Sequence, residues 1–128
     1  MNAKPFHLVA LLAALFLASS PLLAHHSTAE YEMGKTVSVI GTVTEFAWNN
    51  PHAYVYLEVK DDKGDIEKWS GELGTLGQLV RANWRRDTLK PGDHITMFGN
   101  PAKDGRLLMR LQKIILPNGQ ELAAQHVE

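Results

Sequence analysis

The chain has 128 residues, 13 Lys and Arg against 14 Asp and Glu, a formal net charge of −1 at pH 7, and no cysteine. A nearly neutral chain with dispersed charges lacks the basic face that binding to nucleic acid or to an anionic membrane requires. Without cysteine it has neither a disulfide framework nor a site for a lipid anchor. We therefore expect one compact apolar core, a monomer, and no nucleic-acid partner.

Residues 1–24 have the three parts of a cleavable secretory signal peptide. Lys4 makes the start positive, residues 8–18 are an apolar run, and Ala24 is the small residue expected at a cleavage site. The run of 11 residues is well short of the roughly 20 that cross a bilayer, so we expect cleavage rather than a transmembrane anchor. The product would begin at His25, hold 104 residues and be periplasmic.

Residues 25–35 are polar without a clear period and predict an extended N-terminal arm. Residues 36–124 form the predicted folded domain, and residues 125–128 a flexible tail. The domain begins with a strand at residues 37–46, since polar and apolar residues alternate there. Gly41, in the middle of this strand, favours a bulge or a sharp bend, which would let the strand take part in two sheets.

Further β-favouring runs follow, separated by Gly-containing turn signals. They cover residues 53–59, 66–73, 94–99 and 107–116. Asn118-Gly119 is the strongest of the hairpin signals, so a short terminal strand is expected after it.

One helix is predicted between the third and the fourth strand. Thr75 and Gln78 have the spacing of a capping box, and Leu76, Leu79 and Val80 follow at helical spacing. Five or six short antiparallel strands with this one helix predict an all-β fold, a small antiparallel barrel in the oligonucleotide/oligosaccharide-binding (OB) arrangement. The helix would plug one end of the barrel. The alternative is an open antiparallel sheet with the helix across one face.

Three motifs give the chain a family resemblance. They are A-H-H-S at residues 24–27, G-T-V-T-E-F-A-W-N-N-P-H at residues 41–52 and L-K-P-G-D at residues 89–93. In the order and spacing of these motifs the chain resembles an uncharacterised family of small secreted bacterial proteins, classed only as a domain of unknown function. The resemblance implies a secreted domain similar to small β-barrels and supplies no activity.

Cleavage after Ala24 would create a candidate metal site. The α-amine and Nδ1 of His25 can chelate one ion, and a remote imidazole can complete a nitrogen-rich site that suits copper first and zinc second. This resembles the histidine brace of secreted copper proteins. His52 is the better remote ligand, because Pro51 stiffens its corner and neighbouring residues of an extended chain point to opposite sides. His26 would be a replacement or supporting ligand.

The histidines also have ordinary interpretations. His25 and His26 are polar residues that follow a cleavage site, and His52 is a turn residue that bonds to nearby backbone. His94, at the start of a strand, is interpreted as a rim or surface histidine.

A second class of function is the binding of an unknown protein, peptide or glycan. The candidate partner face consists of Trp48, Asn49, Asn50, Tyr54 and Tyr56. Aromatic rings with polar edges supply both stacking and hydrogen bonds to such a partner. The alternative is that these rings only pack in the core and at the ends of the barrel.

Catalysis is not indicated. The chain has no cysteine nucleophile and no Gly-x-Ser-x-Gly elbow. Glu45 and Glu72 would form a carboxylate pair only if the fold brought them together. The sequence therefore favours a secreted binding or accessory domain over an enzyme.

Overall fold

The computed structural model describes residues 26–125. Its helices are α2 (His26–Ala29) and α3 (Leu76–Arg81), and its strands are β1 (Val37–Ala47), β2 (Tyr54–Lys60), β3 (Ile66–Glu72), β4 (His94–Pro101), β5 (Leu108–Ile115) and β6 (Glu121–Ala123). The strands have the predicted order, and their ends differ from the predicted ones by at most two residues. The single turn α2 was not predicted, so the N-terminal arm is not extended throughout.

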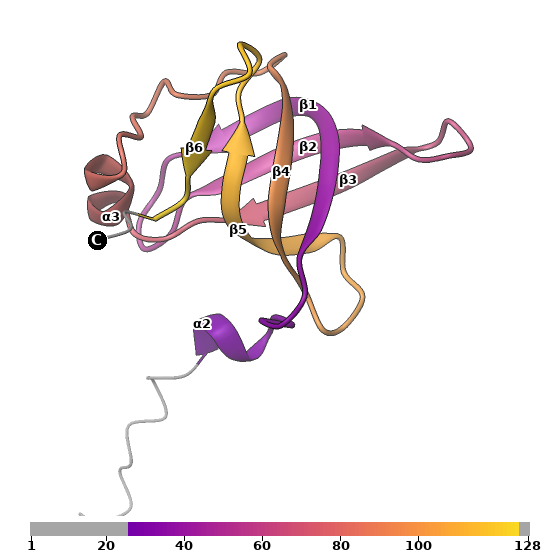
Figure 1. Cartoon of the computed structure of the whole chain (residues 1–128), viewed down its shortest axis with the longest axis horizontal. Coiled ribbons are helices and arrows are strands. Elements are labelled where there is room, and N and C mark those ends of the chain that lie inside the picture. The colour runs from indigo at the N-terminus through magenta and orange to yellow at the C-terminus, as the bar shows by residue number, and fades with distance from the viewer. Residues whose placement is uncertain (1–25, 126–128) are drawn as a thin grey trace, which may run out of the picture.

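The six strands form one sheet in the order β3-β2-β1-β4-β5-β6, and β3 also pairs with β5. That additional pairing is parallel and joins residues 70–72 to residues 108–110, whereas the other pairs are antiparallel. It closes β1 to β5 into a barrel, to which β6 is added (Figure 1). The predicted OB barrel is confirmed, and the open-sheet alternative is wrong. The prediction of purely antiparallel pairing missed the parallel closure.

β1 is bent because it belongs to both halves of the barrel. Its first half pairs with β4 and its second half with β2. A Cβ on Gly41 would collide with the backbone oxygen of Glu58, so only glycine fits where the strand changes partner. The bulge lies just beyond the predicted position, where the register with β2 shifts between Val43 and Glu45. Before the shift the odd-numbered residue Val43 faces the core, and after it the even-numbered residue Phe46 does. The bulge therefore reverses which side chains of β1 point inward.

α3 covers one side of the barrel, and the tip of the β2–β3 hairpin projects from the opposite side (Figure 1). The capping box is present, with Gln78 N donating to Thr75 Oγ1 at 3.3 Å and Thr75 N donating to Gln78 Oε1 at 3.1 Å. Leu79 is fully buried and Leu76 is half-buried in contact with the core. Leu76, Leu79 and Val80 were all expected to plug the barrel, but Val80 is 45% exposed, so this expectation is wrong for Val80.

The core lies inside the barrel and beneath α3. Trp84, just after α3, is fully buried, and its Nε1 donates to the carbonyl of Ala123 at 2.7 Å. This bond ties the helical side of the barrel to β6. Within residues 26–125 there is no helix whose length and hydropathy would let it cross a membrane.

The two glycines Gly41 and Gly77 give a matched test of this packing. We expect Gly41→Ala to lower the free energy of unfolding by about 1–3 kcal/mol, because the new methyl overpacks against backbone. Gly77→Ala should raise it by roughly 0.5–1 kcal/mol, since a Cβ in that helical turn meets open space. Urea denaturation measures both, and equal effects of the two substitutions would contradict the bend at Gly41.

Candidate functional site

Glu72 is the one charged side chain that is buried among those the structure describes, with 6% of its surface exposed. It is the last residue of β3, directly opposite Tyr54 on β2 and Arg110 on β5. Directly paired residues project to the same side of a sheet. The carboxylate therefore lies on the side away from the core, yet it is covered.

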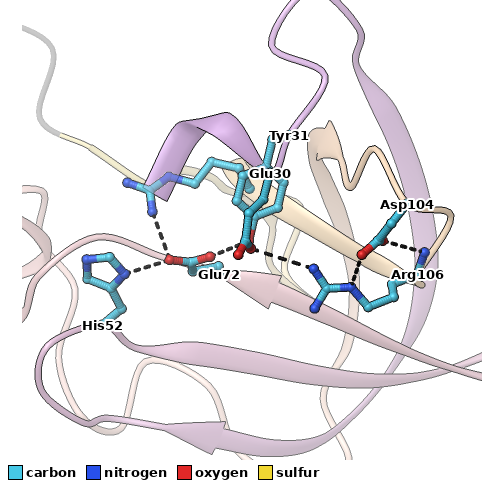
Figure 2. Close-up of polar contacts among 7 residues, drawn as sticks. Glu30, Tyr31, His52, Glu72, Asp104 and Arg106 are labelled. Atoms are coloured by element: carbon cyan, nitrogen blue, oxygen red, sulfur yellow. Dashed lines mark hydrogen bonds and ion pairs between the residues drawn. The ribbon is translucent and has the colours of Figure 1, made fainter. Parts of the chain in front are cut away.

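Three side chains cover the carboxylate and bond to it. His52 Nδ1 lies 2.6 Å from Oε1, Arg110 Nη1 lies 3.4 Å from the same oxygen, and the Tyr31 hydroxyl donates to Oε2. Figure 2 shows the Glu72 carboxylate between His52 on one side and Tyr31 on the other. A buried carboxylate costs several kcal/mol unless it is paired and hydrogen-bonded. Here both oxygens have partners, and we call these four residues the Glu72 cluster.

The contact with Glu72 fixes the orientation of the His52 ring. A carboxylate is an acceptor, so Nδ1 carries the hydrogen and donates it, and Nε2 of the neutral ring is left with a lone pair. The His52 side chain is 26% exposed. Among the residues the structure describes, Nε2 has no hydrogen-bond partner. His52 is thus held at one nitrogen and available at the other.

Two tyrosines next to the carboxylate have altered acidity. Burial raises the pKa of Tyr31 far above its ordinary value of 10.0, and the hydrogen bond to Glu72 raises it further. Burial also raises the pKa of Tyr54, and repulsion from the Glu72 charge is the second cause of this rise. Both phenols therefore stay protonated at neutral and mildly alkaline pH, which lets Tyr31 act as a permanent donor to Glu72.

The sequence pointed to His52 but not to its partner. The sequence suggests for Glu72 only a carboxylate pair with Glu45. Glu45 is exposed and is not among the groups bonded to Glu72. A usable signal was present in the predicted hairpin. A β2–β3 turn centred on Lys63 sets Tyr54 opposite Glu72, so the corner that precedes Tyr54 must end close to Glu72.

Of the three predicted metal ligands, the structure describes the side chain of His52 alone. His25 lies outside the described residues, as does the side chain of His26, where α2 begins. Within the described part of the chain there is no group of three His, Cys, Asp or Glu side chains that could hold a metal ion. The metal site therefore stays a prediction, and it requires His25.

The aromatic residues of the predicted partner face belong to two stacked pairs, one of which includes Phe46 from outside that face. Trp48 stacks on Phe46 at 5.7 Å between ring centroids and packs against the core. Tyr54 stacks on Tyr56 at 6.1 Å with nearly parallel rings. Asn49 and Asn50, between the two pairs, are exposed. A groove of about 280 Å³ lies beside the second pair, lined by Thr44, Glu45, Tyr56, Leu57, Glu58, Lys68, Trp69 and Ser70.

Comparisons with known proteins give one family and a likeness of fold. A family model described as a family of unknown function (DUF6152) matches residues 13–109. No curated protein matches the chain. Among solved structures, the chain is similar to the mitochondrial single-stranded DNA binding protein Rim1 of S. cerevisiae, with 15% identity and a TM-score of 0.45. The match covers 64% of this chain and 92% of that one.

The raised pKa of Tyr31 predicts a loss of stability in alkali. A group whose pKa is higher in the folded state contributes its stability fully below its unfolded value, here 10.0, and loses it as the pH rises further. The wild-type chain should therefore be more stable than Tyr31→Phe at pH 7, and this difference should shrink above pH 10. Urea denaturation between pH 7 and pH 11 measures it. Parallel curves for the two chains would contradict the buried bond to Glu72.

Proposed function

The chain belongs to the DUF6152 family, whose function is unknown, and we propose from its own geometry that it is an exported, periplasmic accessory domain that binds copper. The ligands are the α-amine and imidazole of His25, freed by cleavage after Ala24, and Nε2 of His52. His26 is a supporting or replacement ligand, and zinc is the second choice of metal.

The observation that carries the proposal is the 2.6 Å contact between His52 Nδ1 and Glu72 Oε1. Histidines that bind metals almost always donate their other ring N–H to a carboxylate, a carbonyl or water, which fixes the tautomer and the direction of the ring. His52 has such a partner, and its Nε2 is the nitrogen that remains. The turn interpretation has His52 bonded to nearby backbone, whereas its Nδ1 bonds to a carboxylate 20 residues away.

The N-terminal arm supports the proposal through the same carboxylate. Tyr31 bonds to Oε2 of Glu72, the oxygen next to the one that holds His52. From His25 to Tyr31 the chain has six peptide units, which reach at most about 20 Å when fully extended. The amine created by cleavage can therefore lie no farther than this reach from Tyr31, which is bonded to the same carboxylate as His52.

The donor set favours copper for chemical reasons. It consists of one amine and two imidazole nitrogens, and divalent copper stands at the top of the affinity order for nitrogen sites of this kind. The ligands must be deprotonated to bind, so binding should weaken in acid. Because three nitrogens do not complete the coordination of copper, water would occupy the rest.

Copper binding is tested on protein exported with its own signal peptide, after intact mass has confirmed that it begins at His25. We expect one Cu(II) per chain with nitrogen hyperfine structure in electron paramagnetic resonance. His52→Ala should weaken binding by at least about tenfold, the loss found even for outer partners of metal ligands.

Two controls accompany this experiment. His94→Ala removes an exposed histidine on β4 and should leave the affinity unchanged. One extra residue before His25 keeps every side chain but moves the amine, so it should abolish the tight site. Weak, substoichiometric binding that is indifferent to both His52→Ala and the extra residue would rule out the proposal.

The second candidate function is partner binding at the groove beside Tyr56. The favouring observation is the stacked pair of Tyr54 and Tyr56 next to a groove that carries carboxylate, amine and hydroxyl groups. Aromatic platforms with polar edges suit a glycan or a peptide.

This candidate responds to different substitutions from the copper site. A photo-crosslinking side chain at Tyr56 should give a discrete adduct in exporting cells, while the same group at Asp62, an exposed position in the β2–β3 turn, should not. Tyr56→Ala should leave copper binding intact. Identical crosslinking from both positions would argue against a partner at this groove.

A further inference from the structure

The N-terminal arm is fastened to the end of β4 through its backbone. Glu32 N donates to the carbonyl of Pro101 at 2.9 Å, and Lys103 N donates to the carbonyl of Glu30 at 2.8 Å. Between these two bonds Tyr31 forms a β-bridge with Ala102. The arm thus continues the sheet by one residue pair beyond the end of β4.

A buried amide fixes the place where the arm turns into β1. Asn100 is 2% exposed, and its Nδ2 donates to the carbonyls of Met33 at 3.2 Å and Lys35 at 2.7 Å. Its Oδ1 accepts from Gln112 Nε2 at 3.2 Å. The arm is therefore bonded to the barrel at residues 30–32 by backbone and at residues 33–35 by Asn100, so its path along the barrel is fixed.

Tyr31 is the only buried side chain of residues 28–35. It is 1% exposed, and its hydroxyl ends on Oε2 of Glu72. The two oxygens of a carboxylate belong to one rigid plane, so a bond that fixes Oε2 also fixes the direction of Oε1. His52 bonds to that Oε1. The docking of the arm and the orientation of the imidazole are thus joined through a single planar group.

We infer that Tyr31 is a positioning residue: through Glu72 it couples the docking of the N-terminal arm to the orientation of the His52 imidazole. The coupling itself needs no metal, but its effect on copper affinity rests on the proposed function. A docked Tyr31 limits how far the amine created by cleavage can lie from the Glu72 cluster, so binding needs less ordering of the chain. Tyr31 raises the affinity for copper without contacting the metal.

The chain offers a matched control beside Tyr31. The right-hand side of Figure 2 shows Glu30 paired with Arg106. The paired nitrogen and oxygen lie 3.6 Å apart, and both side chains are about half exposed. Exposed ion pairs of this kind contribute little. Glu30→Gln should therefore leave the arm docked, whereas Tyr31→Phe keeps the buried ring and removes only the hydroxyl that reaches Glu72.

The first readout needs no metal. In the exported protein without copper, NMR of the ring ¹⁵N nuclei should show His52 as the Nδ1–H tautomer, and Tyr31→Phe should shift both nitrogens toward averaged values. The Lys103 amide, which bonds to the arm, should exchange at least about tenfold faster in Tyr31→Phe, because the arm opens more often. Glu30→Gln should match the wild type in both measurements.

The second readout is copper affinity, measured by competition with a chelator. Tyr31→Phe should weaken Cu(II) binding by about tenfold, the lower end of the range found when an outer partner of a metal ligand is removed, since Tyr31 bonds to that partner and not to the ligand. Glu30→Gln should weaken it by less than about twofold. Circular dichroism checks that both variants keep the barrel.

The outcomes separate the two claims. If the ring ¹⁵N shifts of His52 and the amide exchange rate of Lys103 are the same in Tyr31→Phe as in the wild type, the coupling is wrong, whether or not copper binds. If both measurements change in Tyr31→Phe but the wild type binds no copper, the coupling stands and the copper function is wrong.

Discussion

The arrangement of the N-terminal arm, the β1–β2 corner and β5 depends on one interaction, the burial of the Glu72 carboxylate among three donors. Tyr31, His52 and Arg110 come from the arm, from the β1–β2 corner and from β5, and all three end on it. Each donor compensates the cost of burying the charge, and the charge in turn gives the buried Tyr31 hydroxyl its partner. Three segments far apart in the sequence are therefore ordered together.

The closure of the barrel and the formation of this cluster are the same structural event. The parallel pairing of β3 with β5 sets Glu72 opposite Arg110, so the strand pair that completes the barrel also completes the charge pair. Tyr54 lies opposite Glu72 on the other neighbouring strand, which makes the stacked tyrosines an extension of the same surface. A metal at His52 and a partner at Tyr56 would thus share one face of the sheet.

The strands, the helix cap and the OB arrangement could be predicted because alternation and turn residues are local signals. The parallel closure could not, since three paired residues leave no pattern of their own. The bulge was expected at Gly41, where glycine is in fact required by the Glu58 backbone. The stiff corner at Pro51 points to His52 in the sequence. Its partner Glu72 follows only from the register of β2 with β3. What orients His52 is therefore a property of pairing rather than of any single segment.

The central claim is that Glu72 holds His52 so that Nε2 can bind a metal together with the N-terminal amine. A crystal structure of the exported, copper-loaded protein tests it most directly. The account predicts one copper ion bonded to the amine and Nδ1 of His25 and to Nε2 of His52, at distances of about 2 Å, with Nδ1 of His52 still on Glu72. Copper bound away from His52, or His52 turned so that Nδ1 leaves Glu72, would contradict it.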